Sequence, residues 1–134
     1  MKKMFTALLA ILVIVSMTAC TAPVSATEDD SIATIEAYID QLMQMEDMQA
    51  TIEYCKTNNM IHQLEARKDT FVYKYTYTVP VLDNTKELLN SQYGSFESTL
   101  SSVAEGLKVS VPAIKTVVWE YYSMDGELIT SFSF

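Results

Sequence analysis

The 134-residue chain is poor in the residue types from which catalytic and phosphate-binding sites are built, with three glycines, three prolines, two cysteines and one histidine. The glycines stand alone at positions 94, 106 and 126, so the chain has no glycine-rich loop to bind a phosphate group. His62 is the only histidine, and histidine is the commonest base in acid–base and nucleophilic catalysis. These shortages weigh against a nucleotide-binding protein and against a histidine-dependent hydrolase.

The chain also lacks an apolar run long enough to span a membrane. An uninterrupted apolar segment, Leu8 to Val15, follows Lys2 and Lys3 and lies within the stretch from Phe5 to Ala19. A transmembrane helix needs about 20 apolar residues, whereas a short apolar run behind a basic N-terminus is typical of a secretory signal. We therefore expect residues 1–19 to be a cleaved signal peptide.

The end of this segment, Met17-Thr18-Ala19-Cys20, resembles the lipobox of bacterial lipoproteins, with methionine where leucine is commonest. In a lipobox the cysteine is linked to diacylglycerol and becomes the new N-terminus. Two acyl chains anchor a protein stably, because each buried methylene group contributes about 0.8 kcal/mol. The sequence thus predicts a lipid-anchored protein on the outer face of the cell membrane, with Cys20 as the lipidated residue.

Positive charge is scarce in the predicted mature chain. Removal of residues 1–19 leaves 7 of the 9 basic side chains against 17 acidic ones, a net charge of −10. Such a chain repels the phosphates of nucleic acids and of anionic lipid headgroups, so we expect no nucleic-acid partner. The same removal leaves Cys55 as the only cysteine besides Cys20, which excludes a disulfide framework.

The mature chain divides into a tether and one domain. Residues 20–30 are predicted to be the lipidated cysteine and a short acidic tether, and residues 31–134 are long enough for a single domain. Apolar residues recur at helical spacing from Ile32 to Cys55, which predicts a helix capped by Asp30 or Ser31. The pattern also allows a kink or a break near Glu46-Asp47.

Two strands and a second helix follow. Alternating patterns predict strands at residues 60–66 and 71–77. Helical spacing over residues 89–107 then predicts a second helix, with Asp83 or Asn84 as its N-cap and Glu87 placed for a capping box with Asn84. We therefore expect the second half of the chain to repeat the helix–strand–strand order of the first half.

Residues 114–122 and 127–134 are predicted strands joined by a hairpin turn at Asp125-Gly126. The order α-β-β-α-β-β predicts an α+β fold, with two helices packed on one face of a four-stranded antiparallel sheet, and is compatible with an αββ duplication. The predicted core face carries Met60, His62, Leu64, Phe71, Tyr73, Tyr75, Val117, Trp119, Tyr121, Leu128, Thr130, Phe132 and Phe134. The opposite, solvated face is predicted to carry Gln63, Glu65, Lys74, Thr76, Thr116, Glu120, Ser131 and Ser133.

With these elements in place, the mature chain resembles a family of small lipoproteins from Gram-positive bacteria that is catalogued as a domain of unknown function. The likeness rests on the lipobox and on the segments ATIEAYI, DTFVYKYTY and VVWEYYSMDGELITSFSF, which together extend across most of residues 31–134. The closing hairpin, Tyr122 to Phe134, is its most specific part. The resemblance implies a cell-surface lipoprotein of a Gram-positive organism and implies no catalytic residue.

Two chemical alternatives can be stated from the residues themselves. Met45, Met48, Cys55 and His62 are ligands that suit a soft metal such as Cu(I), provided that they converge and remain accessible. Cys55 with His62 is also the only cysteine–histidine pair for an enzyme. However, Cys55 lies on the apolar stripe of its helix, where a thiol stays protonated and inert. We favour a core role for all four side chains, and therefore predict no cofactor.

Tyrosine is the remaining candidate for a binding site, because its ring offers apolar area with a polar tip. Tyr77 and Tyr122 are predicted to reach an aromatic rim near the Pro80 loop. The sequence thus predicts a non-enzymatic domain that binds a protein, a peptide or a component of the cell envelope. A soft-metal or small-ligand carrier is the first alternative, and an unrecognised envelope enzyme is the second.

Overall fold

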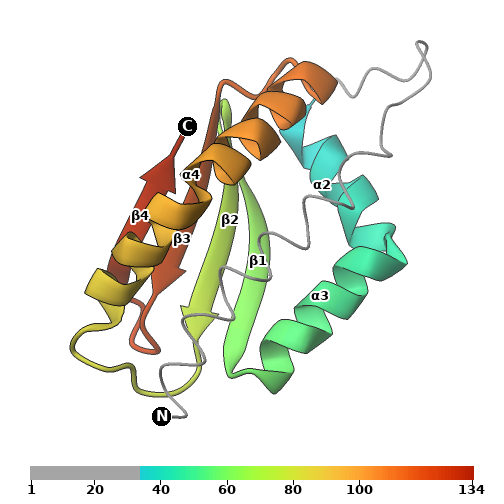
Figure 1. Cartoon of the computed structure of the whole chain (residues 1–134). Helices are drawn as coiled ribbons and strands as arrows, with labels where there is room; N and C mark the ends of the chain where they lie inside the picture. Colours follow the sequence, from blue (N-terminus) through green and yellow to red (C-terminus); the bar gives the residue numbers. More distant parts are fainter. Residues whose placement is uncertain (1–33) are drawn as a thin grey trace.

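The structure is a computed structural model that describes residues 34–134 as three helices and four strands (Figure 1). In chain order these elements are α2 (Ile35–Gln44), α3 (Glu46–Thr57), β1 (Met60–Arg67), β2 (Thr70–Tyr77), α4 (Thr85–Ser110), β3 (Thr116–Tyr122) and β4 (Leu128–Ser133). The predicted signal peptide, Cys20 and the tether lie outside the described residues. Among the described residues, no helix is long and apolar enough to cross a membrane.

The four strands form one sheet in the order β1-β2-β3-β4. Each hairpin is antiparallel, but β2 and β3 are parallel, with Thr70 opposite Thr116 and Thr76 opposite Tyr122. The prediction of an antiparallel sheet is therefore wrong. Strands β2 and β3 are parallel because α4, a 26-residue crossover helix, returns the chain to the end of the sheet where β2 begins.

The prediction of two helices is also wrong, because the first one is divided. Met45 has an extended backbone, with φ −76° and ψ 134°, and it separates α2 from α3. This is the break that the sequence allowed near Glu46-Asp47. The cap of α2 is Thr34, whose side chain accepts a hydrogen bond from the Ala37 N–H at 3.1 Å. Asn84 caps α4, but its side chain forms no capping bond, so the capping box is absent.

The core lies between the helices and one face of the sheet. Helices α2 and α3 pack against β1, whereas α4 packs against β3 and β4 (Figure 1). The large rings of the two central strands fill the interior. They stack across the strands, with Tyr73 on Trp119 at 5.0 Å and Tyr75 on Tyr121 at 5.1 Å between ring centroids. The aromatic part of the predicted core face is thus confirmed.

Leu128 is an exception to the predicted core face. A register irregularity between Tyr121 and Tyr122 places Leu128 opposite Tyr122, and 53% of the Leu128 side chain is exposed. Since side chains alternate along a strand, a one-residue shift turns a side chain to the other face of the sheet. Leu128 therefore lies on the face that the helices leave open.

Candidate functional site

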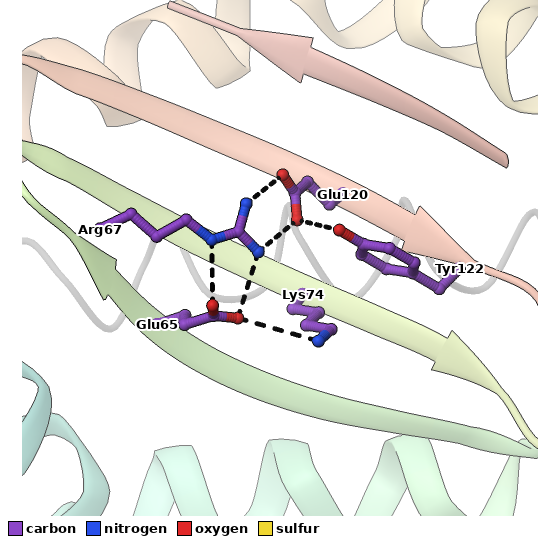
Figure 2. Close-up of polar contacts among 5 residues, drawn as sticks. All are labelled: Glu65, Arg67, Lys74, Glu120 and Tyr122. Carbon is purple, nitrogen blue, oxygen red and sulfur yellow. Dashed lines mark hydrogen bonds and ion pairs between the residues drawn. The ribbon is translucent and has the colours of Figure 1, made fainter. Parts of the chain in front are cut away.

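The open face of the sheet, on the side away from the core, carries a network of five polar side chains (Figure 2). Glu65 and Arg67 extend from β1, Lys74 from β2, and Glu120 and Tyr122 from β3. Successive side chains of a strand point to opposite faces of the sheet, and these five residues alternate with the core residues of their strands. The sheet therefore presents all five on the same face. We call this set the open-face network.

Arg67 is the centre of the open-face network, because its guanidinium group binds two carboxylates. It donates to both oxygens of Glu120, at 2.6 and 2.9 Å, and to both oxygens of Glu65, at 2.9 and 3.3 Å. Arg67 and Glu120 belong to β1 and β3, so their side chains meet above β2 (Figure 2). Val72, on the same face of β2, is fully buried. The network therefore covers the middle of the sheet.

The other two members are held by the same carboxylates. The Tyr122 hydroxyl donates to Glu120 Oε2 at 2.7 Å, and Lys74 Nζ lies 3.8 Å from Glu65 Oε2. Lys74 Nζ is also 4.9 Å from the centroid of the Tyr122 ring, within the range of a cation–π contact. Glu120 is only 8% exposed, so the prediction that its side chain is solvated is wrong.

The pKa values of this face follow from these contacts. The hydrogen bond from Arg67 lowers the pKa of Glu65, and the bond to Glu120 raises the pKa of Tyr122. Both shifts favour the protonation states seen in the network. Its two positive and two negative groups neutralise one another, in a chain whose net charge is −8. The network therefore suits hydrogen bonding and packing better than capture of an ion.

A less polar row runs beside the network on the same face. The register places Ile61, Thr76, Tyr122 and Leu128 side by side across the four strands. Ile61 is 43% exposed and Leu128 is 53% exposed, one at each edge of the sheet. We call these four residues the apolar row. The apolar row thus exposes one aliphatic side chain at each edge, with the half-buried Thr76 and Tyr122 between them.

Of the two tyrosines predicted to form a rim, only Tyr122 lies on this surface. Tyr77 is 2% exposed and lies on the core face, with the rings of Tyr73 and Tyr75. Tyr77 and Tyr122 thus lie on opposite faces of the sheet and do not form one rim. The period of two along each strand explains the difference, because Tyr122 aligns with Thr76 and not with Tyr77.

The residues of the soft-metal alternative lie in or beside the core. Met48, Cys55 and His62 are 5%, 2% and 3% exposed, and Met45 is half-buried. Burial raises the pKa of the Cys55 thiol to about 11 and lowers the pKa of His62 to about 4. Within residues 34–134, no group of three histidine, cysteine or acidic side chains is placed to hold a metal ion. Met48, Cys55 and His62 are therefore not exposed to an incoming ion.

Arg67 was not among the predicted site residues, although the sequence pattern contains a signal for it. Glu65 and Arg67 are two residues apart on one strand, and so share a face. Glu120 is the only charged residue of a strand whose other residues, apart from Thr116, are aliphatic or aromatic. A charge in such a position requires a partner of opposite charge.

The comparisons with known proteins place the chain in a family. A family described as a domain of unknown function, DUF4854, matches residues 26–134. The chain belongs to this family. The family resemblance seen in the sequence is thereby confirmed at the level of a domain of unknown function. No curated protein and no solved structure matches the chain.

Proposed function

We propose that the protein is a lipid-anchored, non-catalytic binding domain on the outer face of a cell membrane. The anchor is supported by the lipobox-like Met17-Thr18-Ala19-Cys20 behind a short apolar run, and Cys20 carries the lipid. The binding role is supported by one observation above all. Ile61 and Leu128 expose apolar surface on a sheet face against which no described helix packs, and Tyr122 lies between them.

The surface favours a partner that binds by packing and hydrogen bonds. The apolar row supplies apolar area, and Tyr122 adds a ring whose orientation is held by Glu120. The Arg67 guanidinium is held in place before any partner arrives, since it already binds two carboxylates. Such preorganisation reduces the entropy lost on binding. A protein, a peptide or an uncharged component of the cell envelope fits these properties.

Photocrosslinking on intact cells tests the binding role. A photoreactive amino acid replaces Ile61 in the full chain, and the matched control replaces Val109, an aliphatic residue on α4 that is 80% exposed. We expect a discrete crosslinked product from position 61 that is absent from position 109 and weakened by Leu128→Ser. Equal labelling at the two positions would contradict binding at the open face.

A separate measurement tests the anchor. Cys20→Ala in the full chain removes the only thiol at the predicted cleavage site. We expect the wild-type protein to remain with the membrane fraction and to incorporate a labelled fatty acid, and the variant to do neither. A wild-type chain that takes up no label would refute lipidation without bearing on the open face.

A further inference from the structure

The outer edge of β4 lacks the charged residues and prolines that often protect an edge strand from pairing. The two edge strands of the sheet are β1 and β4. Strand β1 carries the charged residues Glu65 and Arg67, and both edge strands have a helix packed against their core face, α3 on β1 and α4 on β4. Strand β4, with the sequence LITSFS, has neither a charged residue nor a proline. Charged residues and prolines within an edge strand are common means of protection, so the two edges differ in the charges that β1 has and β4 lacks.

The backbone of β4 offers hydrogen-bonding groups at this edge. Phe134 and Val117 exchange two hydrogen bonds, at 2.9 and 3.0 Å, so Phe134 turns its N–H and C=O toward β3. In an antiparallel ladder, every second residue turns its backbone N–H and C=O toward the neighbouring strand, so Phe132 and Thr130 also turn theirs toward β3. Ser131 and Ser133 therefore direct their N–H and C=O groups away from β3. Both residues are exposed, and β4 has no other neighbouring strand in the sheet of residues 34–134.

We propose that β4 pairs antiparallel with β4 of a second copy of this chain, around a two-fold axis. In this pairing Ser131 lies opposite Ser133 of the second copy, and Ser133 lies opposite Ser131 of the second copy. Each of these two pairs exchanges two backbone hydrogen bonds, which makes four in all. Phe132 then lies opposite its counterpart at the axis, as a pair without backbone bonds between them. Two four-stranded sheets become one continuous sheet.

The side chains of β4 are compatible with their own two-fold copy. On the core face β4 carries Thr130, Phe132 and Phe134, with Phe132 stacked on Tyr93 at 4.1 Å and Phe134 half-buried. On the open face the residues are the small Ser131 and Ser133. Antiparallel pairing places the Phe132 ring next to its counterpart and serine next to serine. The aromatic side chains therefore stay on the core face of the joined sheet and the serines on its open face.

Charge also selects the direction of pairing. The acidic residues next to β4 along the chain are Asp125 and Glu127, in the segment that leads into it, whereas Glu120 of β3 is bound by Arg67. Antiparallel pairing places the two copies of this segment at opposite ends of the joint, whereas parallel pairing would bring them together. The remaining repulsion is that between two acidic domains, since the chain has a net charge of −8. Salt screens such repulsion, so the association should strengthen as salt is added.

Cysteine crosslinking between two differently tagged full chains tests the register. One chain carries Ser131→Cys and the other Ser133→Cys, both with Cys20→Ala, and the remaining native cysteine, Cys55, is buried. Residues opposite one another in this register have Cα atoms about 5.5 Å apart, which a disulfide can span. We expect the mixed pair to give several times more crosslinked dimer than Ser131→Cys paired with Ser102→Cys, an exposed position on α4. The yield should rise with salt.

A second variant separates pairing from folding. Ser131→Pro removes an N–H that points outward, and proline is tolerated in edge strands at such positions. We expect this variant, as the full chain in mild detergent, to keep its circular dichroism and to lose the dimer. Crosslinking no greater than with position 102, or a dimer that survives the proline, would refute the proposal. A product of β4 with another protein and none with itself would replace the second copy by that partner.

Discussion

His62 is a titratable group in the interior of the domain, 3% exposed and stacked on Tyr75 at 4.5 Å between ring centroids. Burial lowers its pKa from 6.5 to about 4, and an interaction with the Lys74 backbone only partly opposes the shift. Between these two values the unfolded chain binds the proton and the folded chain does not. The free energy of unfolding should therefore fall as the pH is lowered from 6.5 to 4, by about 3 kcal/mol in total.

Urea unfolding at a series of pH values between 7 and 4 measures this loss. The variant His62→Phe keeps a ring in the stack and removes the titration, so its stability should depend much less on pH in the same window. The hydrogen bond that lowers the pKa of Glu65 acts at more acidic pH and remains in both proteins. A variant with the same slope as the wild type between pH 6.5 and 4 would assign the acid sensitivity to other groups.

The tyrosine hydroxyls of the two faces differ in their partners. The Tyr73 hydroxyl is buried and has no hydrogen-bond partner among the described residues, whereas the Tyr122 hydroxyl binds Glu120. Removal of an unsatisfied polar group changes the free energy of unfolding little, whereas removal of a hydrogen bond to a charged group lowers it by roughly 1.5 kcal/mol or more. Tyr73→Phe should leave the free energy of unfolding unchanged or raise it, and Tyr122→Phe should lower it. The reverse order in chemical denaturation would contradict the contacts described.

At the scale of the element, the helix caps give a matched comparison. The Thr34 side chain accepts the Ala37 N–H, whereas the Asn84 side chain makes no capping bond. Thr34→Ala should therefore destabilise the domain by about 1 kcal/mol, as loss of a cap usually does. Asn84→Ala should have a much smaller effect on the thermal midpoint. Equal losses of stability in the two variants would show that both side chains act as caps in solution.

The Arg67–Glu120 pair connects two strands that are not neighbours in the sheet. Glu120→Ala leaves the guanidinium with one carboxylate and removes the partner of Tyr122, so we expect a loss on the order of 2 kcal/mol. The control is Glu53→Ala on α3, whose ion pair with Lys56 is 2.9 Å long but exposed. Exposed pairs contribute roughly 0–1 kcal/mol. Denaturation of the two variants under the same conditions compares these costs.

Local patterns predicted the elements well and their side-chain neighbours less well. The alternation in β2 and the helical spacing around Leu89 and Leu100 were sufficient to place these elements, although Val72 on the open face of β2 is also buried. The open-face network was not predicted, because Arg67 and Glu120 are 53 residues apart in the chain. Their contact depends on β1 and β3 being the two neighbours of β2. That arrangement is a property of the whole sheet and of no single strand.

At the scale of the whole molecule, the direction of the second hairpin was the main error. Each hairpin can be predicted from its own turn, but the relation between hairpins depends on the connection. A 26-residue helix is about 39 Å long, and an 8-residue strand about 27 Å. Helix α4 is therefore long enough to run back along the sheet, so that β3 begins beside the first residue of β2. A long helix between two strands favours a parallel pair.

An engineered disulfide tests this parallel arrangement in the full chain. Thr70 and Thr116 are opposite one another and half-buried, so Thr70→Cys with Thr116→Cys should oxidise readily. The crosslink closes a long loop and should stabilise the domain by roughly 3 kcal/mol if its geometry is unstrained. Thr70→Cys with Tyr122→Cys is the control, because these positions would be neighbours only in an antiparallel pair. Mapping of the crosslinked peptides by mass spectrometry distinguishes the two arrangements, and a disulfide formed only in the control would exclude the parallel pair.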